Sequence, residues 1–189
     1  MTLSELKTLI QNYVENEETT FVNTLNDMII NTEERISELI EFDYFRKNVT
    51  GNLTTGNTYL TAPSDFKLSF SLAIIDSNND YHYLDKKHTS FMREYSNDAV
   101  ATSERGRPLY YADFDKDLST ASNNGSTLIV SPVPDQDYNV EIHYLYKPIS
   151  LTSQTTGTWI SQNARNALLY GSLIEAYTFM KGEPEIQVL

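Results

Sequence analysis

The sequence contains no cysteine. Disulfide bonds, thiol nucleophiles and thiolate zinc sites are therefore excluded for this chain. Nowhere do 18 apolar residues follow one another, and the opening stretch "MTLSELKTLIQNYVENEE" has neither a basic start nor an unbroken apolar run. Neither a transmembrane helix nor a signal peptide is expected. These absences predict a soluble protein that is made, and stays, in a cytoplasm-like compartment.

Basic residues are scarce. The chain has 14 Lys and Arg against 26 Asp and Glu, a net charge of −12. Phosphate backbones and anionic lipids bind clustered Lys and Arg, so neither nucleic-acid binding nor membrane binding is favoured. Residues 1–44 hold ten acidic and two basic side chains, a net charge of −8. The N-terminal quarter is predicted to be an acidic surface.

Catalytic motifs are missing as well. The sequence has no G-x-S-x-G, no phosphate loop and no G-x-G-x-x-G, and His82, His88 and His143 lack metal-ligand spacing. Residues 113–124, "DFDKDLSTASNN", begin like a calcium loop, but the glycine at position 6 and the glutamate at position 12 are absent. We interpret them as a solvated acidic turn. No catalytic residue, metal ligand or cofactor site is predicted, and the chain is not expected to be an enzyme.

Residues 1–44 carry the apolar spacing of two helices. Thr2 or Ser4 is expected to cap the first helix, and Thr19 or Thr20 the second. The first apolar stripe is Leu3, Leu6, Ile10, Tyr13 and Val14. The second is Phe21, Val22, Leu25, Met28, Ile29, Ile36, Leu39 and Ile40, with Glu33, Glu34 and Glu38 expected to face away. Neither helix can bury its stripe alone, so each needs a partner.

A third helix is expected after Ser161, over "QNARNALLYGSLIEAYTFMKG", with Gly182 and Pro184 as its stop. Its predicted packed face is Ala164, Ala167, Leu168, Gly171, Ile174, Tyr177 and Met180. Small residues at this spacing allow a neighbouring helix to come close. A neighbour within the subunit is favoured over one across a subunit contact.

Between the helical ends the pattern changes to short runs with a period of two, broken by turn residues. The predicted strands lie in "FRKNVTGNL", "TYLTAP", "KLSFSLAIID", "DYHYLD", "PLYYADFD" and "STLIVSPVPDQDYNVEIHYLY". The last run is interpreted as a hairpin whose second strand turns its tyrosines toward the core, with a tyrosine-lined ligand platform as the alternative. Residues 87–95 indicate a short helix, and residues 96–107 a mobile loop.

The fold class is therefore α+β. Residues 1–44 and 158–189 are predicted to form a helical bundle, with residues 45–157 as a β-rich insertion. Arg105 and Arg107, on the predicted loop, suit docking to an acidic protein surface because guanidinium groups pair carboxylates bidentately. A plain solvated loop is the alternative interpretation.

Three stretches resemble the head-to-tail adaptor, or connector, proteins of tailed bacteriophages, especially short-tailed ones. They are "TLSELKTLIQNYV", the run "GRPLYYADFD" with "TLIVSPVPDQDYNVEIHYLYKPISL", and "NARNALLYGSLIEAYTFMKGE". The resemblance implies a virion structural protein at the head-tail junction. About twelve copies would form a ring, and DNA would pass through its channel. The implied partners are the portal protein above the ring and a tail or nozzle protein below it. An acidic ring would let DNA pass without sticking.

The chain stops soon after the third helix, where such adaptors often continue toward the portal. Ile186, Val188 and Leu189 are apolar residues that would suit a groove-binding tail, or they fray in solvent. Two other functions stay open at this stage. One is a tail-associated module that binds a glycan or receptor through its tyrosines, and the other is a virion hydrolase built on two carboxylates.

Overall fold

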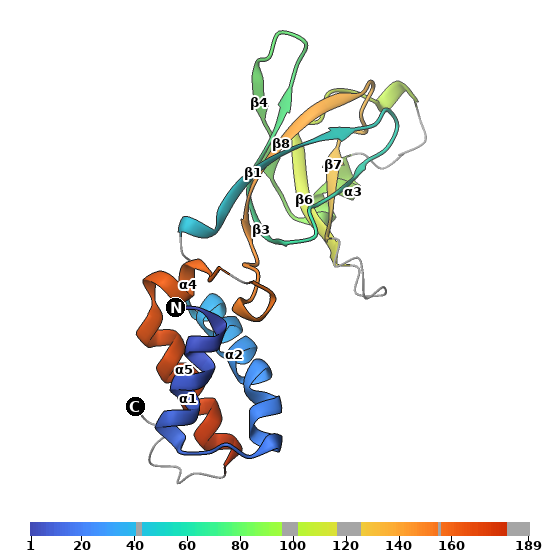
Figure 1. Cartoon of the computed structure of the whole chain (residues 1–189). Helices are drawn as coiled ribbons and strands as arrows, with labels where there is room; N and C mark the ends of the chain where they lie inside the picture. The colour runs from blue at the N-terminus through green and yellow to red at the C-terminus, as the bar shows by residue number, and fades with distance from the viewer. Residues whose placement is uncertain (41–42, 96–101, 117–125, 155, 181–189) are drawn as a thin grey trace. The chain divides into compact units, whose positions relative to one another are not determined.

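The computed structural model describes residues 1–40, 43–95, 102–116, 126–154 and 156–180. It divides into a helical unit, Met1–Phe42 with Pro148–Leu189, and a β unit, Asp43–Lys147 (Figure 1). The mixture of helices and two sheets confirms the predicted α+β class. Within the described residues, no helix is both long enough and apolar enough to cross a membrane.

The helical unit begins with α1 (Leu3–Val14) and α2 (Thr19–Leu39). Of the two predicted caps for α1, Thr2 is the one used: its hydroxyl accepts the Glu5 N–H, and the Glu5 carboxylate accepts the Thr2 N–H. The predicted threonine cap of α2 is wrong. That helix starts without a side-chain cap, and the Asn16 side chain instead accepts the Glu18 N–H just before it.

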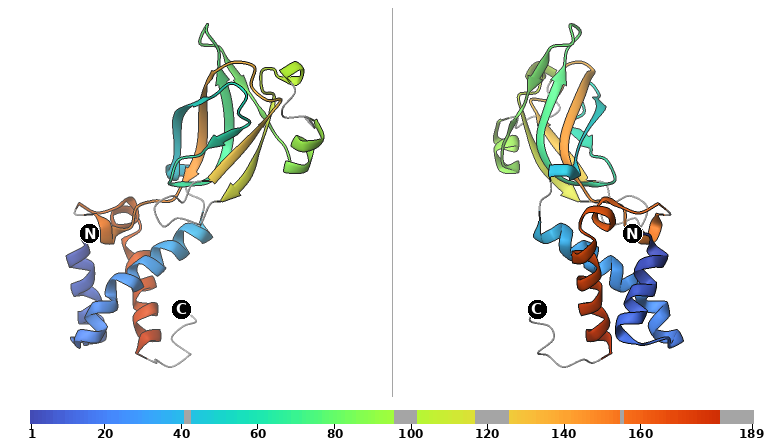
Figure 2. Two further views of the ribbon diagram at one scale, coloured as in Figure 1. Left: turned by 90° about the vertical axis from the view of Figure 1, so that its right-hand side faces the viewer. Right: turned by 60° about the vertical axis from the view of Figure 1, so that its left-hand side comes forward.

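The predicted closing helix is two helices, α4 (Trp159–Asn163) and α5 (Arg165–Phe179). Thr158 caps α4, which begins two residues before the expected boundary at Ser161, and the backbone of Ala164 leaves the helical region between the two helices. Both α1 and α2 contact α5, and the views of Figure 2 show the three helices side by side. The buried apolar residues that they contribute are Leu6, Ile10, Phe21, Leu25, Met28, Ile29, Leu168, Leu169, Leu173 and Ala176.

Parts of the predicted apolar faces are exposed. Tyr13 and Leu39 lie at the C-terminal ends of their helices and face solvent, and Ala167 is exposed on α5. The helix α5 has few charged residues on any side, so its sequence pattern could not select the packed face. Its buried side carries Leu168, Leu169, Ser172, Leu173 and Ala176.

Glu33 corrects another expectation. It was expected to face solvent, but its side chain is buried, and both carboxylate oxygens accept the N–H of Leu151, at 3.1 and 3.2 Å. Leu151 opens the short 3-10 helix η3 (Leu151–Ser153), which contacts α2. A buried N–H needs an acceptor, and here the acceptor is an acidic side chain of the helix beside it.

The β unit contains two four-stranded sheets. In the first sheet the order is β1 (Arg46–Leu53), β8 (Tyr138–Tyr146), β3 (Phe66–Ile75) and β4 (Tyr81–Tyr83), all antiparallel. In the second sheet the order is β2 (Tyr59–Thr61), β7 (Ser126–Ser131), β6 (Tyr110–Lys116) and β5 (Asp85–Lys86), with only β5 and β6 parallel. One buried cluster joins both sheets, including Leu72, Ile74, Val140 and Ile142 of the first and Tyr111, Leu128 and Val130 of the second. The core of this unit therefore lies between the sheets.

The predicted hairpin is wrong, because β7 lies in the second sheet and β8 in the first. The residues between these strands cross from one sheet to the other and bond to separate loops: Gly106 N–H donates to Val133 O, and Gly56 N–H donates to Pro134 O, both at 2.9 Å. The inward face of β8 is confirmed. Its Tyr138 and Tyr144 are buried in the core and form no exposed platform.

The short helix is confirmed as α3 (Thr89–Tyr95), which packs Met92 against Ala112 and Ile129 of the second sheet. The chain also forms the 3-10 helices η1 (Asp43–Phe45) and η2 (Thr102–Glu104). Several predictions fall outside the described residues: the first part of the mobile loop, most of the calcium-like stretch, and the helix stop at Gly182 and Pro184.

Candidate functional site

The two loop arginines lie beside the crossing between the sheets. Arg105 is half-buried, and its guanidinium lies against the turn at Gly56, where a Cβ on that glycine would approach it to 3.1 Å. Its Nε is buried and has no hydrogen-bond acceptor within the described residues. Arg107 is exposed. The structure thus places Arg105 against its own chain and leaves Arg107 accessible, while Ile186, Val188 and Leu189 lie outside the described residues.

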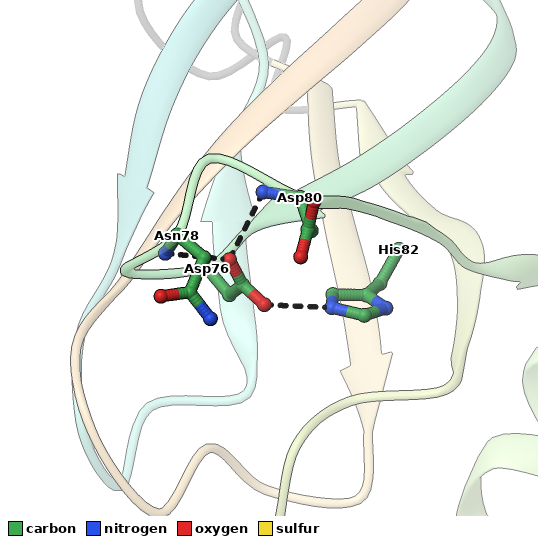
Figure 3. Close-up of polar contacts among 4 residues, drawn as sticks. All are labelled: Asp76, Asn78, Asp80 and His82. Carbon is green, nitrogen blue, oxygen red and sulfur yellow. Dashed lines mark hydrogen bonds and ion pairs between the residues drawn. The ribbon is translucent and has the colours of Figure 1, made fainter.

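The turn between β3 and β4 is closed by Asp76 (Figure 3). Its carboxylate accepts the N–H groups of Asn78 and Asp80, at 2.8 and 3.0 Å, and lies 3.0 Å from Nε2 of His82. The contact with His82, helped by these backbone N–H groups, lowers the pKa of Asp76. One carboxylate therefore holds together the turn of this hairpin.

The histidines have structural partners. His82 belongs to this turn, His88 contacts the Ser90 hydroxyl at the start of α3, and the ring of His143 lies 5.5 Å from that of Phe70. Among the described residues, no group of three acidic, histidine or cysteine side chains is arranged to hold a metal ion.

A shallow groove of about 650 Å³ lies at one end of the first sheet. Its lining is Asn52, Leu53, Thr54, Ile75, Asp76, Ser77, Gln136, Asp137, Tyr138 and Asn139. Tyr138, the tyrosine among them, is buried, and its hydroxyl donates to Asp135. A glycan platform needs an aromatic face open to the ligand, so this groove does not favour the glycan-binding alternative.

A buried tyrosine holds a second acidic side chain in the β unit. The Tyr144 hydroxyl donates to Asp65 at 2.7 Å, and Lys47 Nζ lies 2.6 Å from the other carboxylate oxygen. Burial, followed by the nearby Asp65, raises the pKa of Tyr144. Burial would raise the pKa of Asp65, but the hydrogen bonds from Lys47 and Tyr144 outweigh it and lower that pKa.

Replacing Tyr144 by Phe is expected to lower the free energy of unfolding by about 1.5 kcal/mol, because a hydrogen bond to a charged acceptor is lost. Since the pKa of Asp65 is lowered on folding, its contribution is present above its ordinary pKa of 3.8 and is lost as the pH falls through the folded value. Urea unfolding at pH 7 and at pH 3 measures both effects. The exposed Tyr83→Phe is the control, and equal loss in both variants would contradict the assignment.

An aromatic and cationic cluster, not predicted from the sequence, lies on the second sheet beside α3. Arg93 donates to the Tyr59 hydroxyl at 3.1 Å and lies 5.6 Å from the centre of the Phe114 ring, while the Tyr59 and Phe114 rings are 5.4 Å apart. Tyr59 and Phe114 remain about two-fifths exposed. Aromatic residues and Arg are enriched in protein interfaces. No local pattern could reveal this cluster, because its three residues come from separate elements.

Together these features describe a chain whose polar groups stabilise turns, strands and helix ends. The model of one protein family, the SU10 adaptor protein, matches residues 1–188. The chain therefore belongs to the SU10 adaptor protein family and is a phage structural adaptor. A comparison with curated proteins finds no match. The predicted membership of a phage adaptor family is thereby confirmed, and the family is a structural one rather than an enzyme family.

Proposed function

We propose that this protein is a head-to-tail adaptor of the virion. It forms a ring that joins the portal protein to a tail or nozzle protein and lets DNA pass through its channel. The family match over residues 1–188 carries the proposal. After synthesis in the host cytoplasm, about twelve copies assemble into a ring at the head-tail junction. In such a ring each copy makes the same heterologous contact with the next copy. We also propose that the virus is a short-tailed one.

The distribution of charge supports a DNA passage. Ten of the 26 acidic side chains lie in residues 1–44. In the proposed ring the helices form a bundle at the portal side, and their acidic surfaces repel the phosphate backbone during ejection. The C-terminal residues Ile186, Val188 and Leu189 meet the portal, and the β unit, including Arg107, meets the tail.

Mixing the purified chain with the portal protein of the same virion tests the proposal, with native mass spectrometry as the readout. We expect a complex that contains one portal ring and one closed ring of adaptor copies. Serum albumin, another acidic protein, serves as the control for binding by charge alone. A chain that stays separate from the portal at micromolar concentration would overturn the proposal.

A further inference from the structure

Both edge strands of the first sheet lack a second partner strand within the described residues. In the described part of the chain, β1 pairs only with β8, and β4 only with β3. The strand β1 has eight residues, and all except Leu53 are exposed. On β4, Tyr81 and Tyr83 are 48% and 68% exposed. A strand edge presents unpaired N–H and C=O groups, so a long accessible edge is a ready site for another strand.

The main-chain groups at the β4 edge can be assigned from the pairing. Leu84 N–H donates to Leu72 O at 2.9 Å. In an antiparallel ladder, hydrogen-bonded and non-hydrogen-bonded pairs alternate. Tyr83, one position earlier, and Tyr81, three positions earlier, are therefore in non-hydrogen-bonded pairs with β3. The N–H and C=O groups of both tyrosines point away from the sheet, toward the open edge.

The same alternation carries across the sheet to β1. Because Leu72 bonds to β4, the next residue, Ala73, points toward β8. Its partner in β8 points back toward β3, so the adjacent Val140 points toward β1, where it pairs with Gly51. The neighbours of Gly51, Thr50 and Asn52, must then direct their N–H and C=O groups to the other open edge.

These outward groups share the same two cross-strand rows. One row is Asn52, Asn139, Ile75 and Tyr81, and the other is Thr50, Glu141, Ala73 and Tyr83. Since each strand is antiparallel to its neighbour, β1 and β4 run in opposite directions. A second copy placed beside the first at the same height would bring its β4 antiparallel to β1, with donors and acceptors facing.

We propose that β1 of one copy pairs with β4 of the next copy, with Asn52 opposite Tyr81 and Thr50 opposite Tyr83. The contact joins two different edges and is therefore heterologous; such a contact, repeated from copy to copy, forms a closed ring when the rotation between copies divides a full turn. This inference rests on the self-association in the proposed function and supplies its contact.

Size and charge favour a second copy as the occupant. The two tyrosines of β4 are large, while the facing positions of β1 are small, and a Cβ added at Gly51 would meet only Val140, at 3.7 Å. Neither row places like charges across the contact, because Arg46 and Lys47 lie at the other end of β1. The Asp76 carboxylate already orders the turn that leads into β4, which lowers the ordering cost of pairing at this edge (Figure 3).

Engineered cysteines test the contact cleanly, because the chain has none of its own. Facing residues in such a pair have Cα atoms about 5.5 Å apart, within reach of a disulfide. Thr50→Cys and Tyr83→Cys are mixed under oxidising conditions, both in the chain alone and in the complex with the portal. We expect disulfide-linked dimers in the mixture and none with either variant alone. The double variant should give a ladder of disulfide-linked oligomers that ends at the copy number of the ring.

A proline variant provides a second measurement. Thr50→Pro removes an N–H that faces the open edge, which an edge strand tolerates. We expect the melting temperature of the monomer to stay within a few degrees and the oligomer to be lost. Thr50→Val, which keeps the N–H, is the matched control and should keep the oligomer.

Three outcomes would overturn the proposal. A ring seen by native mass spectrometry without cross-links overturns the edge pairing alone and leaves the adaptor function standing. Linked dimers from Thr50→Cys by itself would mean that β1 of one copy pairs with β1 of another copy. A chain that is monomeric both alone and with the portal overturns the edge pairing and the proposed function together.

Discussion

Replacing Gly171 by Ala is expected to lower the free energy of unfolding by about 1–3 kcal/mol, the usual cost of overpacking. In an ordinary helix interior the same change adds about 1 kcal/mol. Here a Cβ would lie 2.4 Å from Cγ2 of Thr32 on α2. That side chain cannot rotate freely, because its hydroxyl donates to Met28 O at 2.9 Å. Urea unfolding followed by helical circular dichroism measures the change.

Thr32→Ser is the matched control for this clash. Serine keeps the hydroxyl and its hydrogen bond but lacks the methyl group that a new Cβ would strike. Gly171→Ala in the Thr32→Ser background should therefore cost much less than in the native background, which gives a coupling energy of about 1 kcal/mol or more. Stabilisation by Gly171→Ala alone would mean that α2 and α5 are not in this close contact.

Replacing Glu33 by Ala is expected to lower the free energy of unfolding by about 1–3 kcal/mol, because a buried N–H loses its acceptor. Glu33 is 7% exposed, and its carboxylate is the acceptor for Leu151 N–H. Glu33→Gln keeps an acceptor oxygen without the charge and should cost much less at pH 7. Equal stability of the Ala variant and the native chain would contradict the contact.

The pH dependence of Glu33 has a definite sign. Burial raises its pKa above the ordinary 4.5, and the hydrogen bonds from Ser150 and Leu151 only partly oppose this. The folded state therefore holds the proton more tightly than the unfolded state. The stabilisation is fully present below pH 4.5 and is lost as the pH rises through the folded pKa. The stability of the native chain should fall relative to Glu33→Gln over this interval, and parallel pH profiles would contradict the raised pKa.

Local order in this chain was predictable and partner choice was not. Apolar spacing of three and four residues located α1 and α2, and alternation located β8 and its inward face. The predicted pairing of β7 with β8 was wrong. Strands that are neighbours in sequence usually pair, whereas here β7 and β8 belong to different sheets. The predicted exposure of Glu33 was wrong for a similar reason, because its partner Leu151 is 118 residues away in the sequence.

The candidate interaction surfaces show the same limit. Alternation reveals which side chains of β8 face the core, but it does not tell which strand lies at an edge. The edge position of β1 depends on β8 pairing with both β1 and β3, which are distant in sequence. The cluster of Tyr59, Arg93 and Phe114 likewise exists only after β2, α3 and β6 come together. The family, in contrast, was predicted from stretches spread over most of the chain and is confirmed by the match over residues 1–188.

Electron cryo-microscopy of the head-tail junction in the virion that carries this chain tests the central proposal most directly. We predict a closed ring of copies between the portal and the tail, with acidic helices around the DNA passage and the first sheet continuous from β1 of each copy to β4 of the next. Density for the chain only at the periphery of the tail, away from the portal, would contradict the adaptor function.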